Sequence, residues 1–236
     1  MKRELPWCAS AQQFSGNVNN QMSAEQPQYF IFDLDGTLIN SLPDLLIALN
    51  LLRQELALAP LTTAQVTQMV GDGATMLVKR ALGDRYEQPL LRRFLDIYSE
   101  HFLDQTRCYP GIVDLLKRHS PKRMAVVTNK PILYTRKILD GLNLSQFFAA
   151  VIGGDTYPHK KPHPYPVQQA LKQLGGRPDQ TIMIGDHHTD LYAARDANIT
   201  SCFCAYGYGH SDGLVPDYQV HKPEELLKLF PGAAID

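Results

Sequence analysis

The chain has 236 residues, of which 44% are hydrophobic and 20% charged, and its formal net charge is −1. This composition is typical of a globular protein and excludes a disordered chain, and the balanced charge gives no reason to expect nucleic acid or an anionic membrane as a partner. No apolar stretch reaches the length of a membrane span and the first residues lack the apolar region of a signal peptide, so we expect a cytoplasmic protein.

The first strand is predicted directly after a polar N-terminal segment. Residues 1–27 are rich in Gln, Asn and Ser and show no periodicity, which predicts a flexible arm. Residues 29–32 (YFIF) are typical of a buried strand, which ends at Asp33-Leu34-Asp35-Gly36. Because side chains alternate along a strand, Asp33 and Asp35 point the same way and repel each other unless a cation or a proton intervenes. Gly36 allows the chain to turn sharply after them.

An all-helical segment follows this strand. The leucines between residues 42 and 56 fall at helical spacing, with Ser41 as the expected N-cap and Pro43 in the first turn. Helical patterns continue over about 62–70, 74–82 and 87–105, and we expect no strand among them. These patterns predict a helical cap domain spanning residues 41–107.

From residue 109 onward, helical and strand patterns alternate. Strands are expected within 123–130, 149–154, 181–186, 201–206 and 218–220, with helices near 109–118, 131–140, 165–174, 189–197 and 223–230. Such alternation is typical of a parallel sheet covered by helices on both faces. The sequence therefore predicts an α/β fold with a Rossmann-like core in two pieces, 28–40 and 108–236. Cys202 and Cys204 could be half of a metal site, but we expect them on one face of a buried strand.

Polar residues stand where several of these strands end. Asp33 and Asp35 follow the first strand, Thr128-Asn129 and Asp186 follow two others, and Lys160-Lys161-Pro162 lies in the loop after a fourth. Ligands of open α/β sheets bind at the carboxyl ends of the strands, so we expect these residues to line one polar cleft.

The order and spacing of these residues resemble the four motifs of the haloacid dehalogenase superfamily. The matching segments are Asp33-Leu34-Asp35-Gly36-Thr37-Leu38, Thr128-Asn129, Lys161-Pro162 and Gly185-Asp186 with Asp190. A helical insert after the first motif is similar to a C1-type cap, and MVGDGATMLVKRAL, YPGIVDLLKR, VVTNKP and KKPHPYP are similar to the phosphoglycolate phosphatase branch.

The resemblance implies phosphoryl transfer through an aspartyl-phosphate. Asp33 is the expected nucleophile, and Asp35 is the expected general acid and then the base. Mg²⁺ is expected on the Asp33 carboxylate, the Asp35 backbone carbonyl and the Asp186 carboxylate, with Asp190 orienting a metal-bound water or Lys161. The expected substrate contacts come from Gly36, the Thr128 hydroxyl, the Asn129 backbone N–H and the Lys161 ammonium group. Counting one lysine against four carboxylates also favours a divalent cation.

Two segments depart from that pattern or add to it. His187 and His188 stand where the branch more often has Ser and Arg, and we expect a tolerated loop variation; the alternative is that His187 contacts the phosphate and adds a pH dependence near neutrality. The segment AYGYGHSDG resembles a Tyr-Gly-Tyr loop of the branch, and we expect a plain turn there.

The favoured function is a Mg²⁺-dependent phosphomonoesterase for a small phosphorylated metabolite, with 2-phosphoglycolate first. A phosphomutase, a pyrophosphatase and a non-catalytic phosphate-binding protein are the alternatives. We expect a monomer or a homodimer. The cap does not identify the substrate: Gly71-Asp72-Gly73 could bind an anion, and Lys79 and Arg80 could bind a carboxylate, but a solvated helix face is the preferred interpretation of the last two.

Overall fold

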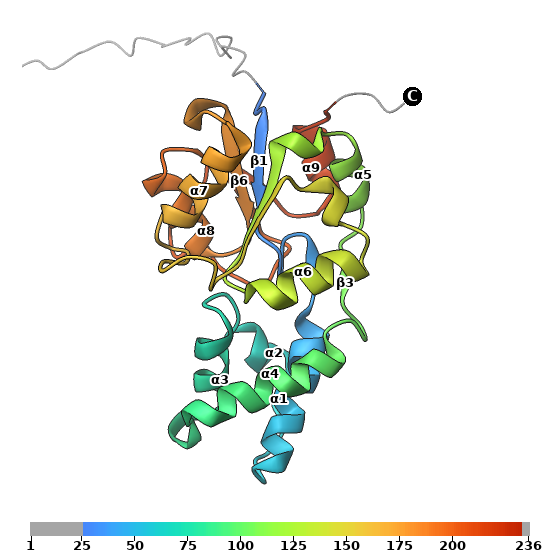
Figure 1. Cartoon of the computed structure of the whole chain (residues 1–236), viewed down its shortest axis with the longest axis vertical. Helices are drawn as coiled ribbons and strands as arrows, with labels where there is room; N and C mark the ends of the chain where they lie inside the picture. Colours follow the sequence, from blue (N-terminus) through green and yellow to red (C-terminus); the bar gives the residue numbers. More distant parts are fainter. Residues whose placement is uncertain (1–25, 233–236) are drawn as a thin grey trace, which may run out of the picture.

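A computed structural model describes residues 26–232, and the predicted arm at residues 1–27 lies almost wholly outside this range. Its centre is a parallel six-stranded sheet with the order β5-β4-β1-β6-β7-β8, which confirms the predicted α/β class (Figure 1). The strands are β1 Tyr29–Phe32, β4 Met124–Val127, β5 Ala150–Ile152, β6 Thr181–Gly185, β7 Thr200–Cys204 and β8 Tyr218–Val220.

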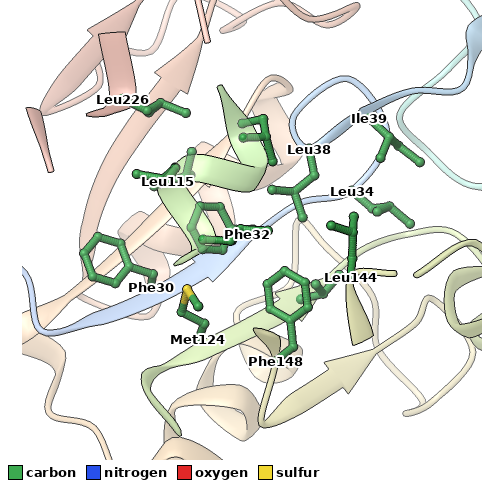
Figure 2. Packing of buried hydrophobic residues seen from close by; sticks show 14 of the residues in the cluster. Phe30, Phe32, Leu34, Leu38, Ile39, Leu115, Met124, Leu144, Phe148 and Leu226 are labelled. Atoms are coloured by element: carbon green, nitrogen blue, oxygen red, sulfur yellow. The ribbon is translucent and has the colours of Figure 1, made fainter. Parts of the chain in front are cut away.

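Both faces of this sheet are covered by helices, as the alternating pattern predicted. On one face, Phe30 and Phe32 pack against helices α5 Ile112–Lys117, α6 Ile132–Gly141 and α9 Glu224–Leu229 (Figure 2). On the other, Ile31 packs against α7 Tyr165–Leu174 and α8 His188–Asp196. Cys202 and Cys204 are buried together in the first of these clusters, as expected for one face of a strand. The central strand is therefore apolar on both sides, which explains its uninterrupted apolar sequence.

The segment after β1 forms a separate helical unit with its own apolar core. Its helices are α1 Leu42–Glu55, α2 Thr63–Thr67, α3 Ala74–Leu82 and α4 Gln88–His101, and they gather beyond one end of the sheet (Figure 1). Tyr134 of α6 packs into the same core and so connects it to the sheet. A short 3₁₀ helix, Gly83–Arg85, lies within this unit, and others outside it cover Pro121–Arg123, Ser145–Phe147 and Pro178–Gln180.

A small antiparallel pair of strands joins the two parts, and the sequence did not indicate it. Strand β2 Ile39–Asn40 pairs with β3 Arg107–Cys108 where the chain enters and leaves the helical unit. Strands of two residues are too short to show an alternation of apolar and polar side chains, so no sequence pattern reveals them. The pair lies at the predicted limits of the cap, although the division into domains at 28–40, 41–107 and 108–236 stays a prediction.

Asp44 links the segment where the chain enters the helical unit to the segment where the chain leaves it. This carboxylate in the first turn of α1 is fully buried and accepts hydrogen bonds from the Gln105 and Thr106 backbone N–H groups at 2.9 Å and from the Thr106 hydroxyl at 2.7 Å. Within residues 26–232, no helix combines the length and the apolarity needed to cross a bilayer.

Candidate active site

Asp33 lies at the carboxyl end of β1 and pairs with Lys161. The Lys161 Nζ atom is 2.8 Å from Asp33 Oδ1 and 2.6 Å from Asp190 Oδ1, and all three side chains are largely or wholly buried. Burial opposes the charged form of Lys161, but the two neighbouring carboxylates outweigh it and raise its pKa. Lys161 therefore stays an ammonium group in contact with Asp33, and the predicted contact between Asp190 and Lys161 is present.

Asp35 has a different cation as its partner. The Lys130 Nζ atom lies 3.0 Å and 3.1 Å from the two Asp35 carboxylate oxygens and 4.8 Å from the centre of the Tyr98 ring. The Ser41 hydroxyl also donates a hydrogen bond to Asp35, so Ser41 stands at the N-cap position of α1 without capping it. The count of one lysine against four carboxylates was therefore wrong: the structure brings two buried ammonium groups to Asp33, Asp35, Asp186 and Asp190.

Asp186 follows β6 and is held by three hydrogen bonds. The Thr37 hydroxyl donates to Oδ1 at 3.0 Å, and the backbone N–H groups of Tyr208 and Gly209 donate to Oδ2 at 2.8 Å and 3.1 Å. A Cβ atom at Gly36 would lie 2.2 Å from Asp186 Oδ2, so only glycine fits beside this carboxylate. Gly36 thus makes room for this carboxylate, and the substrate contact that the resemblance implied for Gly36 stays a prediction.

The loop Tyr206-Gly207-Tyr208-Gly209 also does more than the plain turn that we expected. The Tyr206 hydroxyl donates to the Thr37 carbonyl oxygen at 2.8 Å, and the Ser41 backbone N–H donates to the Tyr208 hydroxyl at 2.7 Å. Because Tyr208 also contributes its N–H to Asp186, this loop connects the carboxylate to the entry of the helical unit.

Burial changes the acidity of both predicted metal-binding carboxylates. It raises the pKa of Asp33 to about 6 and of Asp186 to about 8; Lys161 opposes the first shift, and the other buried carboxylates add to both. Such shifts mean that the charged forms are disfavoured unless a cation compensates them.

The arrangement of these oxygens fits a divalent cation. One carboxylate oxygen from each of Asp33, Asp186 and Asp190 lies within 4.8 Å of the others. The buried Asp33 Oδ1 touches the Lys161 ammonium group but accepts no geometrically proper hydrogen bond from any described residue. Asp190 already accepts hydrogen bonds from the Lys161 ammonium group and, at 3.0 Å, from the His187 backbone N–H. Asp33 and Asp186 are therefore the better candidates for a hard cation that prefers oxygen ligands.

Thr128 and Asn129 stand beside these groups at the end of β4. The Thr128 hydroxyl oxygen accepts the Lys130 N–H at 3.2 Å. The Asn129 side-chain amide donates to the carbonyl oxygens of Gly71 and Lys161 at 3.0 Å and 2.9 Å, and so ties the helical unit to the lysine loop. This use of the Asn129 side chain was not predicted from the sequence.

His187 is buried and caps α8. Its ring Nδ1 lies 3.2 Å from the Thr189 hydroxyl, and its backbone N–H donates a hydrogen bond to the Asp190 carboxylate. Burial lowers the pKa of His187 to about 4, and the adjacent His188 acts in the same direction. The ring is therefore neutral near neutral pH, which favours the structural interpretation over a pH-dependent phosphate contact.

The cap residues singled out in the sequence have different surroundings. Gly71 and Gly73 line the cavity over the site, but the Asp72 side chain pairs with Arg80 on the surface and its carbonyl oxygen accepts from Lys160. Lys79 is exposed and lies over the Tyr86 ring, 5.3 Å from its centre. Neither Lys79 nor Arg80 lines the cavity, in agreement with a solvated helix face.

The cavity itself has a polar floor and apolar walls. It encloses about 650 Å³ of unfilled space, counting its open mouth, and reaches Asp33, Asp35, Asp186, Thr128 and Asn129. Lys130 is the only lysine or arginine among the described residues that line it. Its walls come mainly from the helical unit and α6: Leu45, Val70, Leu77, Phe94, Tyr98 and Tyr134. A space of this size suits a small anion, with the Lys130 ammonium group as the cation in its lining.

Comparison with known proteins is consistent with this geometry. A family model described as "Haloacid dehalogenase-like hydrolase" matches residues 30–204. The phosphoglycolate phosphatase of Aquifex aeolicus is 35% identical over 208 residues, which cover 87% of this chain and 98% of that protein. The phosphoglycolate phosphatase of Pseudomonas putida is 36% identical over 219 residues, covering 88% and 80%. A crystal structure from Haemophilus somnus, described as a predicted phosphoglycolate phosphatase, shares the fold with a TM-score of 0.79 and 29% identity, covering 86% and 98%.

Proposed function

The chain belongs to the haloacid dehalogenase-like hydrolase family and is a phosphatase of that family, and from this premise we propose that it hydrolyses a small phosphate monoester, 2-phosphoglycolate first. The observation that carries the proposed mechanism is the buried Asp33 carboxylate at the cavity floor, 2.8 Å from the Lys161 ammonium group. The similarity of the chain to the phosphoglycolate phosphatases of Aquifex aeolicus and Pseudomonas putida supports the choice of substrate.

A divalent cation, Mg²⁺ in our proposal, would be held by the Asp33 and Asp186 carboxylates and the Asp35 backbone carbonyl. When bound, it would neutralise charge on the phosphate and on the two carboxylates. Two ammonium groups against four carboxylates leave two negative charges uncompensated if all four are ionised, which a divalent cation offsets.

Asp33 is the proposed nucleophile. A carboxylate oxygen of Asp33 forms a bond to phosphorus while the bond from phosphorus to the ester oxygen breaks, which leaves an aspartyl-phosphate. Lys161 holds the nucleophile in place and stabilises the negative charge on the transferring group, and Asp190 fixes Lys161 from the other side. Thr128 and Asn129 are the proposed phosphate contacts beside it.

Asp35 is the proposed proton donor and acceptor. It gives a proton to the departing ester oxygen, and it then takes a proton from the water that attacks the aspartyl-phosphate. The second step releases inorganic phosphate and restores Asp33. Its contacts with Lys130 and Ser41 hold its carboxylate on the cavity side of the strand end.

Lys130 is the proposed partner of the substrate carboxylate. It lines the cavity and is held beside Asp35, so a carboxylate two bonds beyond the ester oxygen would lie within its reach. This assignment makes phosphoglycolate a better substrate than an alkyl phosphate of equal size.

The proposal is tested by measuring phosphate release from a panel of small phosphate esters, with Mg²⁺ or with EDTA. We expect turnover that requires the metal, is fastest with 2-phosphoglycolate and is abolished in Asp33→Asn, while circular dichroism shows that the variant is folded. Full activity of Asp33→Asn would refute the mechanism. Product analysis separates a phosphomutase or a pyrophosphatase, and no turnover across the panel would favour a non-catalytic phosphate-binding protein. The cytoplasmic location and the monomeric or homodimeric state stay predictions.

A further inference from the structure

Three histidine rings gather beside the carboxylate site; His187 also lines its cavity, whereas His188 and His210 do not. His187 is the N-cap of α8, His188 is its first residue, and His210 lies in the loop that follows β7. The ring centres are 4.0 Å apart for His187 and His188, 4.9 Å for His188 and His210, and 5.4 Å for His187 and His210. One ring nitrogen from each histidine lies within 4.8 Å of the other two.

The nitrogens of this cluster are not fully used inside the protein. His188 Nδ1 is buried and has no hydrogen-bond partner among the described residues. His187 uses Nδ1 toward Thr189, which leaves Nε2 as its available nitrogen. A buried polar atom without a partner costs free energy, so an unpaired imidazole nitrogen inside a group of three needs an explanation.

We propose that His187, His188 and His210 form a second metal site, which binds a divalent transition-metal cation of the Zn²⁺ type. Imidazole nitrogen suits Zn²⁺, Co²⁺ and Ni²⁺, whereas Mg²⁺ prefers oxygen ligands. Three histidines with one open position form a known type of zinc coordination. The chemistry of the ligands therefore separates this site from the neighbouring carboxylates.

The geometry requires only small side-chain movements. Zn²⁺ binds imidazole nitrogen at about 2.0–2.1 Å, so two nitrogens on one tetrahedral ion lie about 3.3 Å apart. Rotation of the half-buried His188 ring and the exposed His210 ring can shorten the present separations. His187 is buried under Gly71, where a Cβ atom would lie 2.4 Å from Nε2, so this ring is the fixed ligand and the other two adjust to it.

The site would link two segments that are distant in the sequence. His187 and His188 stand directly after the strand-end Asp186, and His210 directly follows Gly209, whose N–H holds that carboxylate. A cation bound by all three would thus fix the Tyr208-Gly209 loop to the start of α8. The proposal does not depend on the substrate of the enzyme.

The test measures Zn²⁺ binding to protein without an affinity tag, by equilibrium dialysis in excess Mg²⁺ to occupy the carboxylates. We expect one tightly bound Zn²⁺ per chain, and about tenfold or greater loss of affinity in each of His188→Ala and His210→Ala. Co²⁺ provides a second readout, because nitrogen ligands in a tetrahedral site give intense visible absorption that both variants should lose.

A matched control uses another pair of histidines. His159 and His163 stack with ring centres 4.1 Å apart, but among the described residues they belong to no group of three potential metal ligands. The double variant His159→Ala/His163→Ala should bind Zn²⁺ like the unmodified protein. His210 is exposed and lies outside the catalytic cavity. The Mg²⁺-dependent turnover of His210→Ala without Zn²⁺ should therefore be unchanged, which would show that this variant is folded. The absence of bound Zn²⁺, or equal binding by His188→Ala, His210→Ala and the unmodified protein, would overturn the proposal.

Discussion

The Lys130 ammonium group lies 3.0 Å from Asp35 Oδ1, and both side chains are mostly shielded from water. Burial opposes the charge on Lys130, but Asp35 and Tyr98 outweigh it and raise the pKa of Lys130 above its ordinary value. The two aspartates of the first motif are therefore each paired with a lysine, Asp33 with Lys161 and Asp35 with Lys130. Separate partners allow the two carboxylates to take different roles although they stand two residues apart.

Replacing Lys130 by Met should reduce kcat/KM for 2-phosphoglycolate by about 100-fold or more, because Asp35 loses its partner and the substrate carboxylate loses its cation. Lys130→Arg should recover part of the loss, since it keeps the charge. Phosphate release by the purified variants, with circular dichroism as the folding check, measures this effect.

Ethyl phosphate separates the two roles of Lys130, because it replaces the carboxylate of phosphoglycolate by a methyl group. If Lys130 binds the substrate carboxylate, Lys130→Met should lower the preference for phosphoglycolate over ethyl phosphate by about 10–100-fold. An equal loss with both substrates would limit Lys130 to holding Asp35 and would contradict the carboxylate assignment.

The sheet, its helices and the polar end of the strands could be predicted from sequence patterns for a physical reason. Strands such as Tyr29–Phe32 and Thr181–Gly185 are buried on both faces, so their apolar composition is visible without knowledge of the fold. Asp33 and Asp186 follow these strands directly, and a parallel sheet brings such positions together.

The parts that were missed depend on contacts between distant segments. Lys130 follows Thr128-Asn129 in the sequence and could have been suspected, but its pairing with Asp35 spans 95 positions. Tyr208 meets Asp186 from a loop that carries only turn signals in the sequence. In the sequence, Asp44 looks like an ordinary acidic residue in the first turn of a helix, yet its carboxylate accepts a hydrogen bond from the Thr106 backbone N–H. No local pattern encodes these partners.

Gly207→Ala should abolish most of the activity. A Cβ atom at Gly207 would lie 2.4 Å from Asp186 Oδ2 and 2.5 Å from the Gly36 carbonyl oxygen, so it displaces a proposed metal-binding carboxylate. We expect at least about a 100-fold lower kcat and weaker Mg²⁺ dependence, since a misplacement of about 1 Å can cost this much. Steady-state kinetics over a range of Mg²⁺ concentrations measure both effects.

Gly213→Ala is the matched control for that variant. Gly213 lies in the same region of the chain, but a Cβ atom there meets nothing within 4 Å, and its φ of +76° adds only backbone strain. We expect a stability loss of about 1 kcal/mol with kcat retained. Equal loss of turnover in the two variants would show that loop flexibility matters more than the position of Asp186.

His187→Ser should leave the shape of the pH–rate profile unchanged between pH 6 and pH 8. Burial and the neighbouring His188 lower the pKa of His187 to about 4, so the ring does not change charge in this range. Profiles of kcat/KM for both proteins, measured at saturating Mg²⁺, test this expectation. An inflection near neutrality that disappears in His187→Ser would instead support a direct contact between His187 and the phosphate.

The metal-free protein should become less stable as the pH rises from about 6.5 to 8. The pKa of Asp186 is raised to about 8 by burial and by Asp33, above its value in the unfolded chain, so the folded state binds the extra proton and loses that advantage as the carboxyl ionises. His187 acts in the opposite direction only below pH 6.5, because its pKa is lowered to about 4. The free energy of unfolding in EDTA, measured by urea denaturation, should fall by at most about 1.4 kcal/mol per pH unit in this window. Mg²⁺ should stabilise the protein more at pH 8 than at pH 6.5, and Asp186→Asn should flatten both trends. A stability that rises with pH across this window in EDTA would contradict the assignment of Asp186 as the carboxylate that needs a cation.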